Sequence, residues 1–327
     1  MNVRFMYSML HCGLFLVLSV ALWSCSNIQW IYVDRLAPAK VSIPDKVRRI
    51  AVVNNQPVME NPHVLNFWMM DTRVLVDSLA QRLADSHYFN EVVVLDSVLT
   101  TMSDPISYDR RQLSLPVVNK LSRQLGVDML VSVEFAGFVL DDEMNYPYYS
   151  GTIYSLVKLY IPGQENPYVH TIQEKEEIYD APGQLLEEWV YTKAISVLYS
   201  QIVPHWISVE LPYYTGANVD MRDASVYVRE GNWEKVLDLW QRQLKHKNHF
   251  RRMEANLNMA VWHEVHDDSI GMAKQYAQKA KELLKKKKNR TYLDRRRFIS
   301  DYIRGMEERG KDLERVKEQM RRFSDDF

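Results

Sequence analysis

Two histidines at helical spacing are the residues of this sequence that most readily suggest metal chemistry. His263 and His266 flank Glu264 in the run HEVHD, and imidazoles three residues apart share one face of a helix. Zinc proteases, however, place their two histidines four residues apart, with the glutamate between them. We therefore expect a solvated helix end before a turn, and we predict no metal site and no cofactor.

Three consecutive carboxylates could also do chemistry. Asp141, Asp142 and Glu143 directly follow a predicted strand over residues 128–140, and ligands of open α/β sheets often bind where strands end. These carboxylates could hold a cation or act as acid and base, or they could simply keep a loop hydrated. The sequence has no dinucleotide-binding, phosphate-binding or serine-hydrolase motif, so we expect that the protein is not an enzyme.

Cys25 is the residue whose surroundings indicate a modification. It follows Leu22-Trp23-Ser24 at the end of an apolar run that begins at Cys12, and Arg4 supplies the positive charge expected before such a run. Leucine three residues before a cysteine and a small residue directly before it resemble the lipobox of bacterial lipoproteins. The resemblance implies that residues 1–24 are a signal peptide and that Cys25 carries fatty chains such as palmitate. A transmembrane anchor is the competing interpretation, but the run is shorter than the ~20 residues that span a bilayer.

The residues after Cys25 predict where the protein is held. Residues 25–45 are interpreted as the lipidated cysteine and a tether, which passes into an edge strand and is stiffened by prolines at positions 38 and 44. Ser26 resembles the residue that sorts lipoproteins to the outer membrane. No acidic run of the kind that moves lipoproteins to the cell surface follows it. We expect a lipid anchor in the outer membrane, with the protein facing the periplasm.

Composition indicates a folded protein of more than one domain. The chain has 327 residues, of which 46% are hydrophobic and 25% charged, as in ordinary globular proteins. Without the signal peptide about 300 residues remain, which is more than one hydrophobic core usually serves. The formal net charge of −1 argues against nucleic acid as a partner. Cys12 leaves with the signal peptide, so no free thiol remains for a disulfide or for catalysis.

Residues 46–215 are predicted to fold as a mixed α/β sandwich. Short apolar runs such as EVVVLD indicate strands that are covered on both faces, and apolar residues at helical spacing indicate amphipathic helices. The predicted strands span residues 47–54, 91–96, 128–140, 152–161 and 168–180, and the predicted helices span 64–87, 114–126 and 184–207.

The order of these elements resembles that of known periplasmic domains. The stretches RRIAVV, HYFNEVVVLD and LGVDMLVSVEFAGF are similar to the curli secretion channel and to the N-terminal domain of TolB. This resemblance covers residues 46–143 and implies a fold rather than an activity. The stretch before RRIAVV also resembles uncharacterised lipoproteins with C-terminal helical repeats.

Residues 216–327 are predicted to form an all-α repeat domain. Ala224, Tyr227 and the turn Gly231-Asn232-Trp233 resemble the first helix and turn of a tetratricopeptide repeat, and a second unit follows. Val236 and Ala273 occupy equivalent places 37 residues apart, close to the ~34-residue period of this repeat. We expect residues 292–323 to form a capping hairpin.

Several aromatic and basic residues are candidates for contacts with partners. Tryptophans at repeat positions can line a groove, although they also commonly form the core, and aromatic loops are enriched at interfaces. A basic run can contact an anionic surface, or it can be a solvated loop. The candidates for a partner-binding groove or aromatic loop are Trp233, Trp240, Asn256, Trp262, Tyr148 and Tyr149, and those for an anion contact are Lys285, Lys286, Lys287, Lys288 and Arg290.

Together these features predict a lipid-anchored periplasmic scaffold or adaptor that binds another envelope protein through its helical repeats. An envelope enzyme or ligand-binding module that uses the carboxylates at 141–143 is the alternative. A subunit of a secretion or pore assembly is a further alternative, which rests on the fold resemblance alone.

Overall fold

The chain folds into two compact units, each assembled from segments that are distant in the sequence. The structure is a computed structural model, and it describes residues 28–56, 63–64, 67–95, 113–140, 148–163, 168–182, 186–216, 218–267, 269–285 and 290–326. The α/β unit comprises Leu36–His205 together with Glu314–Phe327, and the helical unit comprises Trp206–Leu313 together with the residues up to Arg35. The fold is therefore mixed α and β, with the helices concentrated in the C-terminal part.

A seven-stranded sheet forms the centre of the α/β unit. Its first long strand is buried between two parallel neighbours, and an antiparallel pair extends the sheet on one side. The strands are β2 (Arg49–Asn54), β3 (His63–Val64), β4 (Phe67–Met69), β5 (Glu91–Leu95), β6 (Met129–Leu140), β7 (Tyr148–Ile161) and β8 (Tyr168–Pro182). β6 pairs with β7 along one edge and with β2 and then β4 along the other.

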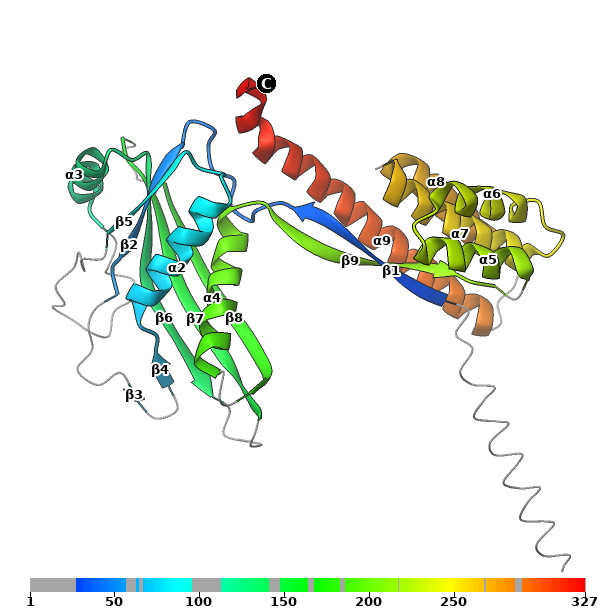
Figure 1. Ribbon diagram of the computed structural model, residues 1–327, viewed down its shortest axis with the longest axis horizontal. Coiled ribbons are helices and arrows are strands. Elements are labelled where there is room, and N and C mark those ends of the chain that lie inside the picture. The colour runs from blue at the N-terminus through cyan, green and yellow to red at the C-terminus, as the bar shows by residue number, and fades with distance from the viewer. Residues whose placement is uncertain are drawn as a thin grey trace, which may run out of the picture. The chain divides into compact units, whose positions relative to one another are not determined.

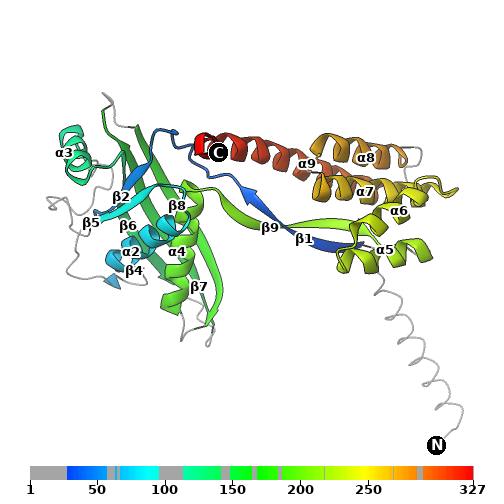
Figure 2. The same cartoon turned by 45° about the horizontal axis from the view of Figure 1, so that its top comes forward.

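Helices cover both faces of this sheet (Figures 1 and 2). α2 (Thr72–Asp85) and α4 (Leu186–Ile202) lie on one face, and α3 (Leu115–Leu125) lies on the other. Along β2, Ile50 and Val52 face the core under α2 and α4, whereas Ala51 and Val53 face the core under α3. Burial on both faces explains why the central strands are almost wholly apolar.

The predicted elements of this unit are confirmed in outline, with one helix start corrected. β2, β5, α3 and β6 lie at the predicted positions, and Gly126 ends α3 in a left-handed conformation with φ of 64°. Residues 64–71 were predicted as helix, but part of this stretch forms β4, which pairs with β6. α2 begins only after Asp71, whose carboxylate accepts a hydrogen bond from the backbone N–H of Arg73. A side-chain cap of this kind fixes where a helix starts.

The proline-rich stretch predicted as a tether belongs to the core of the α/β unit instead. Val41 and Ile43 are buried against the α2 and α4 face. The side-chain amide of Gln319 accepts a hydrogen bond from the backbone N–H of Ala39 at 2.9 Å and donates one to its carbonyl oxygen at 3.0 Å. The C-terminal segment, which sequence spacing did not connect to this stretch, therefore holds it in place.

Arg322 fastens the C-terminal segment to the α/β unit. It lies in the 3₁₀ helix η3 (Met320–Asp326) and is only 1% exposed. Its guanidinium donates to the carbonyl oxygens of Val47 at 2.6 Å, Tyr88 at 3.2 Å and Pro44 at 3.3 Å, and it lies 4.1 Å from the centroid of the Tyr88 ring. A buried cation is tolerated because several acceptors and an aromatic face replace its water.

The helical unit contains two helical hairpins and a long final helix. The helices are α5 (Val219–Arg229), α6 (Trp233–Gln243), α7 (His249–His266), α8 (Ile270–Glu282) and α9 (Arg290–Gln319). Asn218, Asn232 and Asn248 cap the N-termini of α5, α6 and α7 through their side chains. The predicted capping hairpin over residues 292–323 is wrong, since α9 is one helix of 30 residues.

A two-stranded sheet completes the helical unit. β1 (Ile28–Ala37) and β9 (His205–Tyr214) run in opposite directions in both views (Figures 1 and 2). We predicted a helix up to residue 207 and a domain boundary at 215, but α4 ends at Ile202, because Pro204 cannot continue it. The chain then enters β9, whose Leu211 and Tyr213 are buried among the helices, so the second segment of the helical unit starts at Trp206.

We predict that Arg322→Ala destabilises the α/β unit by about 3 kcal/mol, because three carbonyl oxygens, two of them in buried hydrogen bonds, lose their donor. Urea unfolding followed by circular dichroism measures the change. Lys317→Ala is the matched control: Lys317 is exposed and pairs with Glu314 at 2.8 Å in an exposed ion pair, so this variant should change stability by less than about 1 kcal/mol. Equal effects of the two substitutions would contradict the anchoring role of Arg322.

Candidate partner-binding site

The helical unit has an open pocket of about 590 Å³ between α7, α8 and α9. It is lined by His249, Arg252, Asn256, Lys279, Glu282, Leu283 and Tyr292. His249 and Tyr292 form one wall, where their rings stack with centroids 5.7 Å apart and the imidazole Nε2 lies 2.6 Å from the phenol oxygen. The pocket thus combines an aromatic wall with charged and amide groups, as binding sites commonly do.

Two cations and one carboxylate give the pocket its electrostatic character. The guanidinium of Arg252 donates to the carbonyl oxygens of His246 at 2.7 Å and Lys247 at 3.0 Å, which fixes its position. Lys279 is exposed and its amine lies 5.0 Å from the centroid of the Tyr276 ring. Glu282 is the opposing charge and is paired with Lys285 outside the pocket at 3.3 Å. This arrangement favours a ligand that carries a negative or hydrogen-bond-accepting group.

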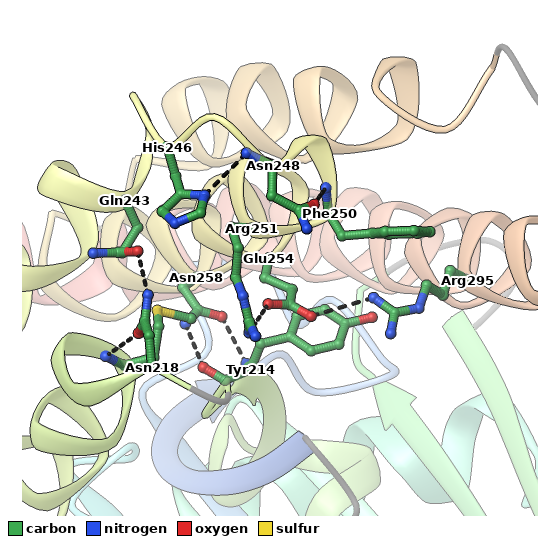
Figure 3. A network of polar contacts seen from close by, with 11 residues as sticks. Tyr214, Asn218, Gln243, His246, Asn248, Phe250, Arg251, Glu254, Asn258 and Arg295 are labelled. Atoms are coloured by element: carbon green, nitrogen blue, oxygen red, sulfur yellow. Dashed lines mark hydrogen bonds and ion pairs between the residues drawn. The ribbon is translucent and has the colours of Figure 1, made fainter.

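A network of polar side chains holds α7 behind this pocket (Figure 3). The amide of Asn258 accepts a hydrogen bond from the backbone N–H of Tyr214 and donates one to its carbonyl oxygen, both at 2.7 Å. Glu254, which is 3% exposed, accepts hydrogen bonds from Arg251 at 3.0 Å and Arg295 at 3.3 Å. Burial raises the pKa of Tyr214 to about 12. The network therefore joins α7 to β9 and to α9, and it fixes the helix that carries His249, Arg252 and Asn256.

Gly216 provides the close approach that this network requires. Its φ of 58° lies in the left-handed region, and an added Cβ would lie 2.8 Å from the Cβ of Met221. Any other residue would strain the backbone and push against α5. The turn between β9 and α5 therefore depends on this glycine.

The structure separates the residues that we predicted for a partner-binding groove. Asn256 lines the pocket, and its amide donates to the carbonyl oxygen of Arg252 at 2.6 Å. Trp240 was wrong as a contact residue, because it is fully buried and β9, which the sequence did not predict, places Tyr213 beside it with ring centroids 6.0 Å apart. Trp233 and Trp262 lie away from the pocket: the indole N–H of Trp262 donates to the carbonyl oxygen of Trp233 at 3.3 Å.

The remaining predicted contact residues are divided between described and undescribed segments. Tyr148 and Tyr149 are the first residues of β7, opposite Pro182 and Ala181, rather than part of a loop. Lys285 and Arg290 are exposed. The predictions for Cys25, Asp141, Asp142, Glu143, Lys286, Lys287 and Lys288 lie outside the described residues.

The HEVHD run contains a buried ion-pair centre, which corrects our prediction of a solvated helix end. Glu264 is fully buried and accepts hydrogen bonds from Tyr302 at 2.7 Å and from Arg309 of α9. Arg35 of β1 lies 3.6 Å from the same carboxylate. His263 pairs with Asp267 at 2.8 Å. Within the part of the chain that the structure describes, no three His, Cys, Asp or Glu side chains are grouped so that they could hold a metal ion.

Among the described side chains of the α/β unit, Glu134 is a buried carboxylate whose pKa is raised. Glu134 lies at a bulge in β6 and is 1% exposed. Loss of water raises its pKa, while hydrogen bonds and the nearby Lys158 amine lower it less. Its two oxygens accept from the Asn55 amide at 2.8 Å and the Tyr160 hydroxyl at 3.4 Å. These contacts occupy the carboxylate, so it joins strands rather than lining a pocket.

The side chain of Gln56 fills a neighbouring gap in the sheet. The backbone N–H of Ala136 donates to its Oε1 at 2.6 Å, and its Nε2 donates to the carbonyl oxygen of Met70 at 3.2 Å. The gap lies along the edge of β6, between Val133, which is the last residue paired with β2, and Gly137, which is the first paired with β4. Buried backbone groups need such partners, which explains why polar residues follow the apolar strand.

Comparisons with known proteins match the two units separately. Residues 47–181 match the model of a domain of unknown function (DUF8603), and residues 222–308 match that of another domain of unknown function (DUF6340). No curated protein matches the sequence. Among solved structures, the hypothetical protein CT253 from Chlamydia trachomatis is 8% identical over 47% of this chain and 97% of that chain, with a TM-score of 0.30. A score this low supports no further argument.

We predict that Glu264→Gln lowers the free energy of unfolding by about 3 kcal/mol, because two partly buried guanidinium groups lose their counter-charge. Thermal and urea unfolding measure the effect. Glu282→Gln is the control, since the Glu282 side chain is 62% exposed and its ion pair lies at the surface. Unchanged stability in Glu264→Gln would show that the buried pair is dispensable.

Glu134 should make stability depend on pH. Its pKa in the folded protein lies above the ordinary value of 4.5, so the folded state binds the proton more tightly than the unfolded chain does. The free energy of unfolding should then fall as the pH rises above 4.5. In Glu134→Gln, which keeps both partners but cannot ionise, this part of the slope should disappear. Urea unfolding at a series of pH values tests it, and identical slopes in the two proteins would rule it out.

Proposed function

We propose that the protein is a lipid-anchored periplasmic scaffold or adaptor, whose helical unit binds a segment of another envelope protein. The pocket between α7, α8 and α9 is the observation that carries this proposal. It is open, it is formed by secondary structure rather than by loops, and Glu282 is the one carboxylate among its lining residues. These properties fit the binding of a peptide segment more readily than catalysis.

The helical unit is proposed to be built from tetratricopeptide-like repeats. α6 and α8 begin at Trp233 and Ile270, and the equivalent residues Val236 and Ala273 are both fully buried. Gly231, with φ of 70°, makes the turn between the first two helices. The spacing and the shared burial support two related helical hairpins stacked around one core.

The charges of the pocket suggest the kind of segment that binds. Arg252 and Lys279 outnumber Glu282 in the lining, and Lys285 and Arg290, near the end of α8 and at the start of α9, are exposed. An extended segment that carries an acidic side chain would therefore be attracted. The stacked rings of His249 and Tyr292 provide a surface for an apolar neighbour in the same segment.

The lipid anchor at Cys25 and the outer-membrane location complete the proposal. They rest on the lipobox-like residues before Cys25 and on Ser26 after it. None of the described helices has the length and apolarity that crossing a bilayer requires. Mass spectrometry of the native protein tests the anchor: it should show a chain that starts at a triacylated Cys25, and an unmodified thiol on a chain that starts at Met1 would refute it.

Capture of partners tests the pocket. We predict that Lys279→Glu and Asn256→Ala each reduce, by about tenfold, the amount of envelope protein captured by the purified lipoprotein, because the first reverses a charge in the lining and the second removes an amide. Lys235→Glu is the matched control. Lys235 is also an exposed lysine beside a tyrosine ring, 4.7 Å from the centroid of Tyr227, but it lies on α6 and away from the pocket. Equal capture by all variants would refute the pocket as the binding site.

A further inference from the structure

The sheet formed by β1 and β9 exposes an aromatic face. In β1, Trp30 and Tyr32 are 49% and 68% exposed, whereas the alternate residues Ile31 and Val33 pack against the helical core. In β9, Trp206 is 72% exposed. Tyr32 and Trp206 are the most exposed large hydrophobic side chains of the described residues. We call six exposed residues that lie at alternate positions of these two strands the ribbon face: Trp30, Tyr32, Asp34, Trp206, Ser208 and Glu210.

The two strands present this face together. Residues 30, 32 and 34 alternate with partly buried residues on β1. Residues 206, 208 and 210 also share one side of β9, because successive strand residues point to opposite sides, although Ile207 on the other side is itself 41% exposed. A hydrogen bond from the Tyr32 hydroxyl to Glu210 raises the pKa of Tyr32 and joins the strands on this side. The opposite side is held by the helical core and by Arg35, which reaches Glu264. The ribbon face therefore points away from the helices and toward the solvent.

The short distance in sequence between the ribbon face and the proposed lipid anchor indicates that a membrane is the surface that this face contacts. β1 begins at Ile28, three residues after Cys25. An extended chain spans at most ~3.6 Å per residue, so Trp30 lies within about 18 Å of the anchored cysteine and Tyr32 within about 25 Å. The headgroup layers add about 10–15 Å to the hydrocarbon core of a bilayer. Fatty chains on Cys25 would therefore hold the start of β1 at the membrane surface.

The chemistry of the face fits the same surroundings. Tryptophan and tyrosine prefer the interface between lipid and water, because their rings are apolar and their N–H or O–H groups can still be hydrated. Asp34 and Glu210 give the face negative charge, which an anionic lipid surface would repel and a zwitterionic surface would not. The basic run near residue 285 would instead prefer an anionic lipid surface to a zwitterionic one.

We propose that the ribbon face docks onto the headgroup layer of a zwitterionic bilayer and orients the lipid-anchored protein, an inference that rests on the anchor at Cys25 proposed above. Lipid alone would leave the protein free to rotate about a short chain. Insertion of Trp30, Tyr32 and Trp206 adds a second point of attachment. The helical unit, with its pocket, is then held at a constant distance from the membrane surface.

Site-specific labelling of the full lipidated protein tests this proposal. Cys12 and Cys25 are the only cysteines in the sequence, so Ser208→Cys introduces one thiol, within the ribbon face, for an environment-sensitive fluorophore. Glu188→Cys on α4 is the control, since Glu188 is exposed but lies in the α/β unit. The protein is reconstituted into phosphatidylcholine vesicles whose acyl chains carry a nitroxide quencher near the headgroup.

The label at position 208 should be quenched several-fold more than the label at position 188. Adding Trp30→Ser and Trp206→Ser should abolish that difference, whereas Trp189→Ser, which removes an exposed tryptophan of α4, should not. The quenching should weaken as phosphatidylglycerol replaces phosphatidylcholine. Unaltered melting temperatures would show that the serine variants remain folded.

The remaining outcomes overturn the proposal in distinguishable ways. If mass spectrometry finds the fatty chains and the label at position 208 is quenched no more than that at 188, docking is wrong and the anchor stands. If quenching grows with phosphatidylglycerol, the basic run rather than the ribbon face contacts the membrane. If quenching occurs only with envelope proteins present, the face binds protein. If Cys25 carries no lipid, the anchor and the docking fail together.

Discussion

The carboxylate of Glu264 is the contact on which the helical unit depends. Glu264 lies on α7 and forms ion pairs or hydrogen bonds with Arg35 of β1 and with Tyr302 and Arg309 of α9. It therefore joins three segments that are far apart in the sequence. A buried carboxylate without partners would be prohibitively unfavourable, and these groups can meet it only when all three segments are in place. Both proposed surfaces follow from this contact. β1 carries the ribbon face, and α9 contributes Tyr292 to the pocket.

Side-chain amides supply a second kind of connection, in both units. Asn258 bonds both backbone groups of Tyr214, Gln319 bonds both backbone groups of Ala39, and Gln56 bonds backbone groups on two sides of a gap in the sheet. In each case an amide provides the donor and the acceptor that a neighbouring strand would have provided. Buried polar residues are thus a means by which distant segments are joined in this fold.

The sequence predicted those helices and strands that are determined by residues within or directly beside them. The apolar run at β5 and the Pro116 and Gly126 signals of α3 were read correctly, because burial on two faces and helix caps leave marks within a few residues. The start of α2 and the strand β9 were missed, since pairing with β6 and β1 decides them. The candidate site shows the same division. Asn256, a candidate for the groove, lines the pocket, and its role in binding stays a prediction. Trp240 became core because an unpredicted strand covers it. The role of Glu264 could not be predicted, because Arg35 and Arg309 lie 229 and 45 residues away.

The position of Arg322 has a consequence for the order in which the chain can mature. The carbonyl oxygens of Val47 and Tyr88 accept hydrogen bonds from Arg322, which lies 275 and 234 residues further along the chain. Contacts at such separations slow folding, because the intervening chain must be ordered first. During synthesis the α/β unit therefore stays incomplete until almost the last residue has emerged, although most of its sequence precedes residue 206. The helical unit contains nothing beyond Leu313, so all of its residues have emerged before Arg322 does, and the α/β unit is the later of the two to be completed.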